Sequence, residues 1–154
     1  MNKAHKFETQ LSWTGAASGP TSSYAAYSRE YVVSASGKQP LSCSADPVFR
    51  GDKELYNPEE LLVASLSGCH MLSYLAEAAR AGVHVVAYED SASGTMVVEG
   101  GGGHFTEVTL RPHVTISAGD PEVAQSLHDR AHSVCFVASS MNFPVRHEAR
   151  VTVA

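Results

Sequence analysis

Charged residues are scarce in this chain. They make up 18% of its 154 residues, whereas hydrophobic residues make up 44%. Soluble domains typically carry about 25% charged residues, so this composition excludes a disordered chain and leads us to expect that part of the surface faces another subunit. Lysine and arginine total 11 against 16 acidic residues, which gives a formal net charge of −5. Nucleic-acid binding requires a basic face, and the composition therefore argues against DNA or RNA as a partner.

Cysteine is equally rare. Cys43, Cys69 and Cys135 are too few and too scattered for the disulfide framework of a small secreted protein. The first residues lack the apolar run of a signal peptide. No stretch approaches the roughly 18 uninterrupted apolar residues of a membrane span. We therefore expect a cytoplasmic protein whose cysteines are either buried thiols or reactive ones.

The chain shows no internal repeat and no low-complexity linker, so we predict one domain over residues 1–154. In its first third, alternating apolar and polar residues predict short strands. A loop rich in Gly, Ser, Thr and Pro follows the first strand, and a turn-rich segment precedes the first helix. The predicted strands span 7–13, 31–35 and 39–43, the loop spans 14–29, and the turn-rich segment spans 46–58.

The first helix has clear start and stop signals. Asn57 can cap it, Pro58 suits its first position, and two acidic residues follow in the first turn. No proline interrupts the residues from Leu61 to Ala81, and Gly82 is placed as a C-terminal stop. The helix is apolar on nearly every face. It is therefore predicted to be buried by the sheet and by a partner chain.

The rest of the chain alternates strands with one more helix. Four consecutive glycines at 100–103 predict a hairpin turn, because they lack the Lys-Ser/Thr of a phosphate-binding loop. Asp120, Pro121 and Glu122 repeat the cap, proline and acid signature that begins a helix. The whole order of elements predicts an α+β fold. The expected elements are strands within 83–98, a long strand at 105–117, a helix from 121 to about 139, and a closing strand at 145–153.

Two of the cysteines are candidates for redox chemistry. Cys69 falls in the middle of the first predicted helix and Cys135 falls inside the second, so packing of the two helices could bring them face to face. A lone cysteine on an apolar helix is ordinarily a small core side chain. Beside a cation, however, a thiol becomes a thiolate that attacks peroxide oxygen, and the resulting sulfenic acid condenses with a second thiol. Arg29 and Glu59 offer a charge pair for this purpose.

Two segments resemble signatures of the OsmC/Ohr family, which comprises osmotically inducible protein C and the organic hydroperoxide resistance proteins. The segment 57–62 (NPEELL), followed by SGC at 67–69, is similar to the first cysteine helix of that family. The segment 131–135 (AHSVC), followed by SSMNFPV at 139–145, looks like its second cysteine helix and exit strand. The resemblance spans roughly residues 7–153.

The resemblance implies an intertwined homodimer in which antiparallel sheets from both chains wrap two long central helices. It also implies a thiol-dependent peroxidase that reduces organic hydroperoxides to alcohols without a metal or other cofactor. In this family pattern Cys69 is the peroxidatic nucleophile, and Cys135 is the resolving thiol that closes a Cys69–Cys135 disulfide. An external dithiol reductant, such as a lipoylated protein, would reopen it.

The resemblance also implies roles for charged residues. Glu59 matches the acid that holds an arginine against the thiolate, while a capping-box position explains Glu60 without chemistry. Arg29 is the arginine we predict, although the family places it in a short glycine-flanked loop and this chain has a longer one. Arg50 is the alternative. His70 also departs from the aromatic or aliphatic residue expected after the first cysteine, so we expect a separate OsmC-like branch.

A zinc site is one alternative function. His128, His132 and Cys135 have the i, i+4 and i+7 spacing of one helical face, and Cys69 with His70 could approach from the other helix. Zinc takes such nitrogen and sulfur ligands. The chain has no CxxC or HExxH motif, however, and eight histidines make a chance i, i+4 pair easy.

A second alternative is a non-enzymatic dimer that binds an apolar ligand. Residues of both predicted helices and the segment after them could line such a pocket, although at helical spacing they are more often ordinary core. Cys43 lies outside both helix signatures and is interpreted as structural. Tyr24 and Tyr27 are interpreted as loop packing. The candidate pocket residues are Met71, Leu72, Tyr74, Phe136 and Phe143.

Overall fold

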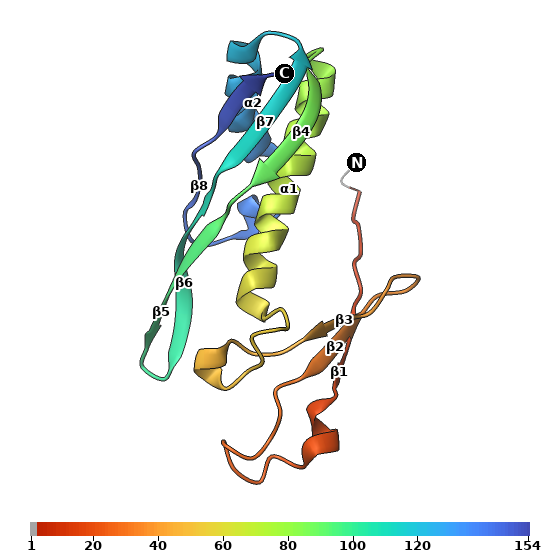
Figure 1. Cartoon of the computed structure of the whole chain (residues 1–154), viewed down its shortest axis with the longest axis vertical. Helices are drawn as coiled ribbons and strands as arrows, with labels where there is room; N and C mark the ends of the chain where they lie inside the picture. Colours follow the sequence, from red (N-terminus) through yellow and green to blue (C-terminus); the bar gives the residue numbers. More distant parts are fainter. Residues whose placement is uncertain (1–2) are drawn as a thin grey trace. The chain divides into compact units, whose positions relative to one another are not determined.

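The computed structural model describes residues 3–154, whose contacts divide into two compact units (Figure 1). The first unit ends at Leu61 and the second runs from Leu62 to Ala154. Both helices and strands occur, which confirms the predicted α+β class. Within the described residues the order is three strands, a long helix, four strands, a shorter helix and two final strands.

The first unit contains an antiparallel sheet of β1 (Gln10–Trp13), β2 (Tyr31–Ser34) and β3 (Leu41–Cys43), in that order. The strand β1 is shorter than predicted. Two 3-10 helices, Gly15–Ser18 and Pro47–Phe49, lie in the two irregular segments.

The long loop between β1 and β2 is closed at its base. The Trp13 Nε1–H donates to the Ser28 carbonyl at 2.9 Å, and the Thr14 and Gly15 amides both donate to the Glu30 carbonyl at 3.0 Å. A Cβ at Gly15 would lie 2.2 Å from the Ser28 oxygen, so no other residue fits without a shift. The two ends of the loop are therefore held together next to the sheet.

Helix α1 (Pro58–Arg80) confirms the predicted boundaries. The Glu60 amide donates to Asn57 Oδ1 at 2.8 Å, and the Asn57 amide donates to Glu60 Oε2 at 3.2 Å. This reciprocal pair is a capping box, which satisfies two amides that the first turn leaves free. At the other end Gly82 has φ +71°, the left-handed conformation that glycine adopts most easily.

The second unit contains two three-stranded sheets, ordered β4-β7-β9 and β5-β6-β8. Neighbouring strands are antiparallel except for two parallel pairs, β6 with β8 and β7 with β9. Gly100 and Gly101, both with positive φ, form the predicted hairpin turn between β5 and β6. The strands are β4 (His84–Asp90), β5 (Ser93–Glu99), β6 (Gly102–Leu110), β7 (Pro112–Ala118), β8 (Val145–His147) and β9 (Arg150–Val153).

Two predictions of a single long strand are wrong. The segment 105–117 contains parts of β6 and β7, and the segment 145–153 contains β8 and β9, so each segment passes from one sheet to the other. The Arg111 amide donates to Asp90 Oδ1 at 2.6 Å, Arg111 Nε pairs with Glu148 Oε2 at 2.9 Å, and the Glu148 amide donates to the Leu110 carbonyl at 2.9 Å. These contacts hold both crossings at the same place. The apolar–polar alternation continues through the breaks, so it does not reveal them.

Helix α2 (Pro121–Val134) begins as predicted, with Asp120 Oδ1 accepting from the Glu122 amide at 2.8 Å. The predicted end near Ser139 is wrong. Cys135 has an extended backbone (φ −73°, ψ 110°), and a separate 3-10 helix follows at Ala138–Ser140. Cys135 organises this break, because its carbonyl accepts from the Ser139 amide at 3.0 Å and its Sγ accepts from the Ala138 amide at 3.5 Å. No glycine or proline marks it in the sequence.

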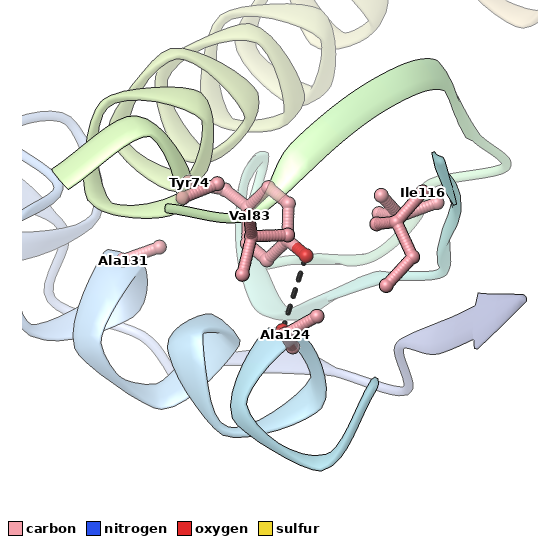
Figure 2. Packing of buried hydrophobic residues seen from close by; sticks show 7 residues of the cluster. Tyr74, Val83, Ile116, Ala124 and Ala131 are labelled. Carbon is pink, nitrogen blue, oxygen red and sulfur yellow. Dashed lines mark hydrogen bonds between the residues drawn. The ribbon is translucent and has the colours of Figure 1, made fainter. Parts of the chain in front are cut away.

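The core of the second unit lies between α1, α2 and the sheets. One buried stripe of α1 packs against α2 and the strand β7, and Figure 2 shows this cluster from close by. A second cluster surrounds Leu66, Val108 and Leu110. The stripe of α1 that the chain itself buries consists of Leu66, His70, Tyr74 and Ala78, which recur every four residues.

The opposite side of α1 is open. By length and hydropathy this helix, alone among the described ones, could cross a membrane, yet only 22% of its most apolar 18-residue window is buried in the chain. Leu72 is 66% exposed. The prediction that the sheet shelters α1 therefore holds for one face, and the other face presents apolar side chains to its surroundings.

Candidate active site

The thiols of Cys69 and Cys135 are neighbours in the second unit, close enough for Cys69 to affect the pKa of Cys135. Cys69 lies in the middle of α1 and is partly exposed, whereas Cys135 at the end of α2 is 1% exposed. Burial, followed by the effect of the neighbouring Cys69, raises the pKa of Cys135 to about 11. Cys135 therefore keeps its proton at neutral pH.

This asymmetry suits two different roles. A partly exposed sulfur can meet a substrate as a nucleophile. A buried sulfur cannot meet substrate, but it can attack a neighbouring oxidised sulfur as its proton passes to the departing hydroxide. Both cysteines are free thiols in the structure. Two neighbouring free thiols are the reactants that disulfide closure needs.

Arg29 lies in the first unit, at the end of the loop between β1 and β2. Its guanidinium donates to the carbonyls of Tyr24 and Tyr27. Its Cζ also lies 3.8 Å from the ring centroid of Tyr27 and 4.7 Å from that of Tyr24, which are cation–π distances. The two tyrosines thus pack in the loop, as expected, and they do so by holding Arg29.

Arg50, the alternative arginine, lines the same cavity as Arg29 in the first unit. This cavity has a volume of about 470 Å³, and Lys53 also lines it. Arg50 has φ +67°, a left-handed conformation that non-glycine residues adopt uncommonly. The structure therefore brings the two candidate arginines to one place, with Arg29 held by its own loop and Arg50 exposed.

The two neighbouring acids of α1 differ in what they contact. Glu60 completes the capping box, as predicted. Glu59 is partly buried, and its charge helps to raise the pKa of Tyr31, after burial of that phenol and the effect of Cys43. The pairing of Glu59 with an arginine stays a prediction.

Cys43 belongs to the first unit and is fully buried in β3. Its thiol donates to the Leu41 carbonyl at 3.7 Å, and Tyr31 lies opposite it on the neighbouring strand β2. A buried thiol in such a strand is a packing element, which agrees with its interpretation as structural.

Histidines occupy the interface of α1 and α2 next to the thiols. His70 and His128 are 1% and 0% exposed, and His70 Nε2 lies 3.1 Å from His128 Nδ1. The spacing of His128 and His132 had indicated a zinc site. In the part of the chain that the structure describes, however, no three His, Cys, Asp or Glu side chains are arranged to hold a metal ion. The buried histidine pair was not predicted from the sequence, although His70 stood out as a departure from the family pattern.

The candidate pocket residues do not form one lining. Tyr74 is fully buried in the core, whereas Leu72 is 66% and Phe136 is 82% exposed. Met71 and Phe143 are partly buried, and Phe143 packs against Phe105 with ring centroids 5.6 Å apart. Most of these side chains are therefore core or open surface.

The α+β fold and the thiol pair near the contact of the two helices define a class of two-cysteine proteins. Comparisons with known proteins identify the family. A family model described as OsmC-like protein matches residues 51–150. The chain therefore belongs to the OsmC family, as the sequence motifs predict. No curated protein matches the chain.

Solved structures agree with this assignment. An OsmC-like protein of unknown function from Vibrio cholerae has a TM-score of 0.86 and 29% identity, covering 96% of this chain and 100% of that one. An organic hydroperoxide resistance protein from Elizabethkingia anophelis has a TM-score of 0.69 and 18% identity, covering 100% of both chains. One from Legionella pneumophila has a TM-score of 0.64 and 16% identity, covering 97% and 99%. At these identities the last two show a shared fold.

Proposed function

We propose that this OsmC family member is a cysteine-based peroxidase that reduces organic hydroperoxides to alcohols. The observation that carries the proposal is the pair of neighbouring thiols of Cys69 and Cys135, in which one sulfur is partly exposed and the other is buried. The names of the similar proteins from Elizabethkingia anophelis and Legionella pneumophila, organic hydroperoxide resistance proteins, agree with this substrate class.

The reaction proceeds in two balanced steps. The Cys69 thiolate attacks the distal oxygen of the hydroperoxide, the O–O bond breaks, and the alkoxide takes a proton and leaves as the alcohol. Cys69 is now a sulfenic acid. The Cys135 sulfur then attacks the Cys69 sulfur, its proton leaves with the hydroxide as water, and a disulfide forms. An external dithiol reduces this disulfide by exchange.

Arg29 and Glu59 are the residues we propose to support the thiolate. A guanidinium beside the sulfur favours its charged form, and a carboxylate orients the guanidinium. In the first unit Arg29 bonds to the carbonyls of Tyr24 and Tyr27. Its use in catalysis therefore requires that these two bonds open or that it turns one free donor toward the thiolate. Arg50, on the same cavity, is the alternative.

A second copy of this chain is proposed to cover the open face of α1. The face carries Leu72, and Phe136 beside the thiol pair is 82% exposed. Exposed apolar patches of this kind mark interaction sites. Covering them would also shield Cys69 from water, which favours reaction with an apolar peroxide.

The experiment is a count of free thiols before and after one equivalent of cumene hydroperoxide, followed by mass spectrometry of the peptides. The expected product is one peptide pair linked through Cys69 and Cys135, with one alcohol formed per disulfide. The Cys69→Ser variant should consume no hydroperoxide, because it lacks the nucleophile. The matched control is Cys43→Ser, which should behave as the parent. Consumption at the parent rate by Cys69→Ser would overturn the mechanism, and unchanged thiols in the parent would favour a binding protein.

A further inference from the structure

The histidine pair is the layer of the helix interface next to the thiols. Successive contacts join α1 and α2 in opposite order: Cys69 with Cys135, then His70 with His128, then the Tyr74 hydroxyl with the Ala124 carbonyl at 3.1 Å. The helices therefore run antiparallel. Figure 2 shows the last of these contacts, one turn beyond the histidines. The histidine layer joins the two helices through a hydrogen bond between two buried side chains that can each take up a proton.

The two rings fit each other closely. Their planes are 6° apart, their centroids are 5.4 Å apart, and the Nε2 of His70 shares a hydrogen bond with the Nδ1 of His128. One nitrogen must donate and the other accept, so at most one of the facing atoms carries a proton. The outer nitrogens, His70 Nδ1 and His128 Nε2, are buried without a partner. A first added proton would leave the shared hydrogen bond in place but would put a charge and a further N–H without a partner in the buried interface, so burial favours two neutral rings.

The surroundings oppose its protonation. Burial, followed by the charges of His147 and His132, lowers the pKa of His70 to about 4, and the nearby Asp90 only partly offsets this. Burial, followed by the charges of His70 and His147, lowers the pKa of His128 to about 3. The ring centroid of His147 lies 5.5 Å from that of His70 and 6.0 Å from that of His128, so a proton on any member repels the others.

The remaining groups around the pair do not neutralise a buried charge. Asp129 pairs with His147 at 3.2 Å, but its side chain is 85% exposed. Asp90 is engaged by the Arg111 amide and the Ser67 hydroxyl. The ring of Tyr74 stacks on His128 with centroids 4.1 Å apart. Tyr88, from β4, packs on Tyr74 with a buried and unpartnered hydroxyl.

We infer that His70 and His128 are positioning residues for disulfide closure: their neutral, hydrogen-bonded pair keeps Cys135 against Cys69, and protonating the pair releases this alignment. This inference rests on the proposed peroxidase function. The step concerned is the attack of the Cys135 thiol on the Cys69 sulfenic acid, which forms the S–S bond and releases water. It requires the sulfurs to approach to about 2.05 Å in a narrow range of dihedral angles. A small separation of the helices is therefore enough to slow it.

The test separates the two redox steps. Reduced protein receives one equivalent of cumene hydroperoxide together with a carbon-acid trap for sulfenic acids, and mass spectrometry measures trapped Cys69 against disulfide. In the parent, the fraction that closes to disulfide should fall about fivefold between pH 7 and pH 3.5, since most of the pair is then protonated. Retention of near-ultraviolet circular dichroism confirms that the chain is folded at each pH.

Two variants isolate the histidines. The double variant His70→Gln, His128→Asn places amide groups where Nε2 and Nδ1 lie, so it keeps a hydrogen bond and cannot titrate. At pH 7 it should form the disulfide to the same extent as the parent. At pH 3.5 and the same trap concentration, the fraction that forms the disulfide should not decrease. The variant His128→Leu keeps the volume but breaks the bond, and should close several-fold more slowly at pH 7. His104→Gln, on the exposed β6, is the matched control and should follow the parent.

The outcomes separate the inference from the proposed function. If no variant, the parent included, oxidises Cys69, the peroxidase proposal fails. If Cys69 is oxidised but the double variant keeps the parent's acid-side fall, or His128→Leu closes at the parent rate, the inference fails. A measurement on the unmodified protein tests the inference even if the variants do not fold. Nuclear magnetic resonance should find two imidazole rings that stay neutral down to about pH 5, and titration of both near pH 6.5 would overturn the inference.

Discussion

The two units of this chain hold their chemically active residues in different ways. In the second unit Cys69 and Cys135 meet because α1 packs on α2, and the contact is part of a core that includes fully buried side chains. In the first unit Arg29 lies on a loop, and the carbonyls and rings of that same loop hold its guanidinium. Packing of buried side chains places the two thiols next to each other, whereas Arg29 makes its hydrogen bonds within its own loop.

This difference indicates how the proposed activity is divided. Both thiols lie in the second unit, so the proposed disulfide closure depends on that unit alone. The proposed activation of the thiolate needs the charge of Arg29, whose guanidinium is held by two carbonyls of its own loop. Variants of the second unit should therefore block formation of the disulfide. Variants of the first unit should lower the rate at which Cys69 reacts with hydroperoxide.

The largest effect is expected in the second unit. Replacement of Cys135 by Ser should abolish steady turnover with a protein dithiol too bulky to reach the sulfenic acid on Cys69, because no internal thiol remains to convert that acid into a disulfide. One equivalent of hydroperoxide should still be consumed, and a sulfenate-specific probe should label Cys69. The measurement is alcohol formed per protein in a single turnover and under continuous turnover. Undiminished steady turnover would show that Cys135 does not resolve the intermediate.

A smaller effect is expected from the arginine of the first unit. Arg29→Gln should lower kcat/KM for cumene hydroperoxide by about 10²-fold, the typical loss when one preorganised charge or donor is removed from a reacting centre. Arg50→Gln is the matched control on the same cavity and should retain activity. The reverse pattern would assign the role to Arg50. Equal losses in both variants would show that the cavity acts as a whole.

The pH dependence of stability should again belong to the second unit. The pKa values of His70 and His128 are about 4 and about 3 in the folded chain, below the ordinary value of 6.5. The unfolded chain therefore binds more protons between these values, and the free energy of unfolding decreases as the pH falls from about 6.5. Urea titrations between pH 7 and pH 5 should show this decrease, with a smaller one in the His70→Gln, His128→Asn variant. Identical profiles would contradict the assigned shifts.

The sequence predicts well what local signals encode. The cap at Asn57, the stop at Gly82 and the glycine hairpin at 100–101 all lie where expected, since each depends on the conformational preferences of one or two residues. The motifs also predicted the family and the position of Cys69 within α1, whereas Cys135, predicted inside the second helix, lies directly after its end. Tertiary contacts decide the rest. The break at Arg111 arises from hydrogen bonds between distant segments, which periodicity cannot reveal. The break before Ala138 is organised by Cys135, and no glycine or proline marks it in the sequence.

The candidate site shows the same division. Cys69 in α1 and Cys135 after the end of α2 are neighbours, while their roles stay a prediction. The histidine spacing on α2 indicated a ligand set, yet His128 faces His70 on the other helix, a partner that no spacing on α2 can specify. The loop before β2 gave no signal that its own tyrosines would hold Arg29, because the contacts depend on how the loop closes.

The smallest effect is expected where two adjacent acids of α1 divide their roles. Glu60→Ala removes the side-chain half of the capping box and frees the Asn57 amide, so the free energy of unfolding should drop by about 0.5–1 kcal/mol. The rate per folded molecule should not change, because Glu60 serves the helix end. Glu59→Gln should leave the free energy of unfolding unchanged and lower kcat/KM, because the proposed role of its carboxylate is to orient the arginine. Denaturant titration and peroxide consumption on the same preparations measure both quantities. A stability loss in Glu59→Gln equal to that in Glu60→Ala would remove the reason for assigning the two acids different roles.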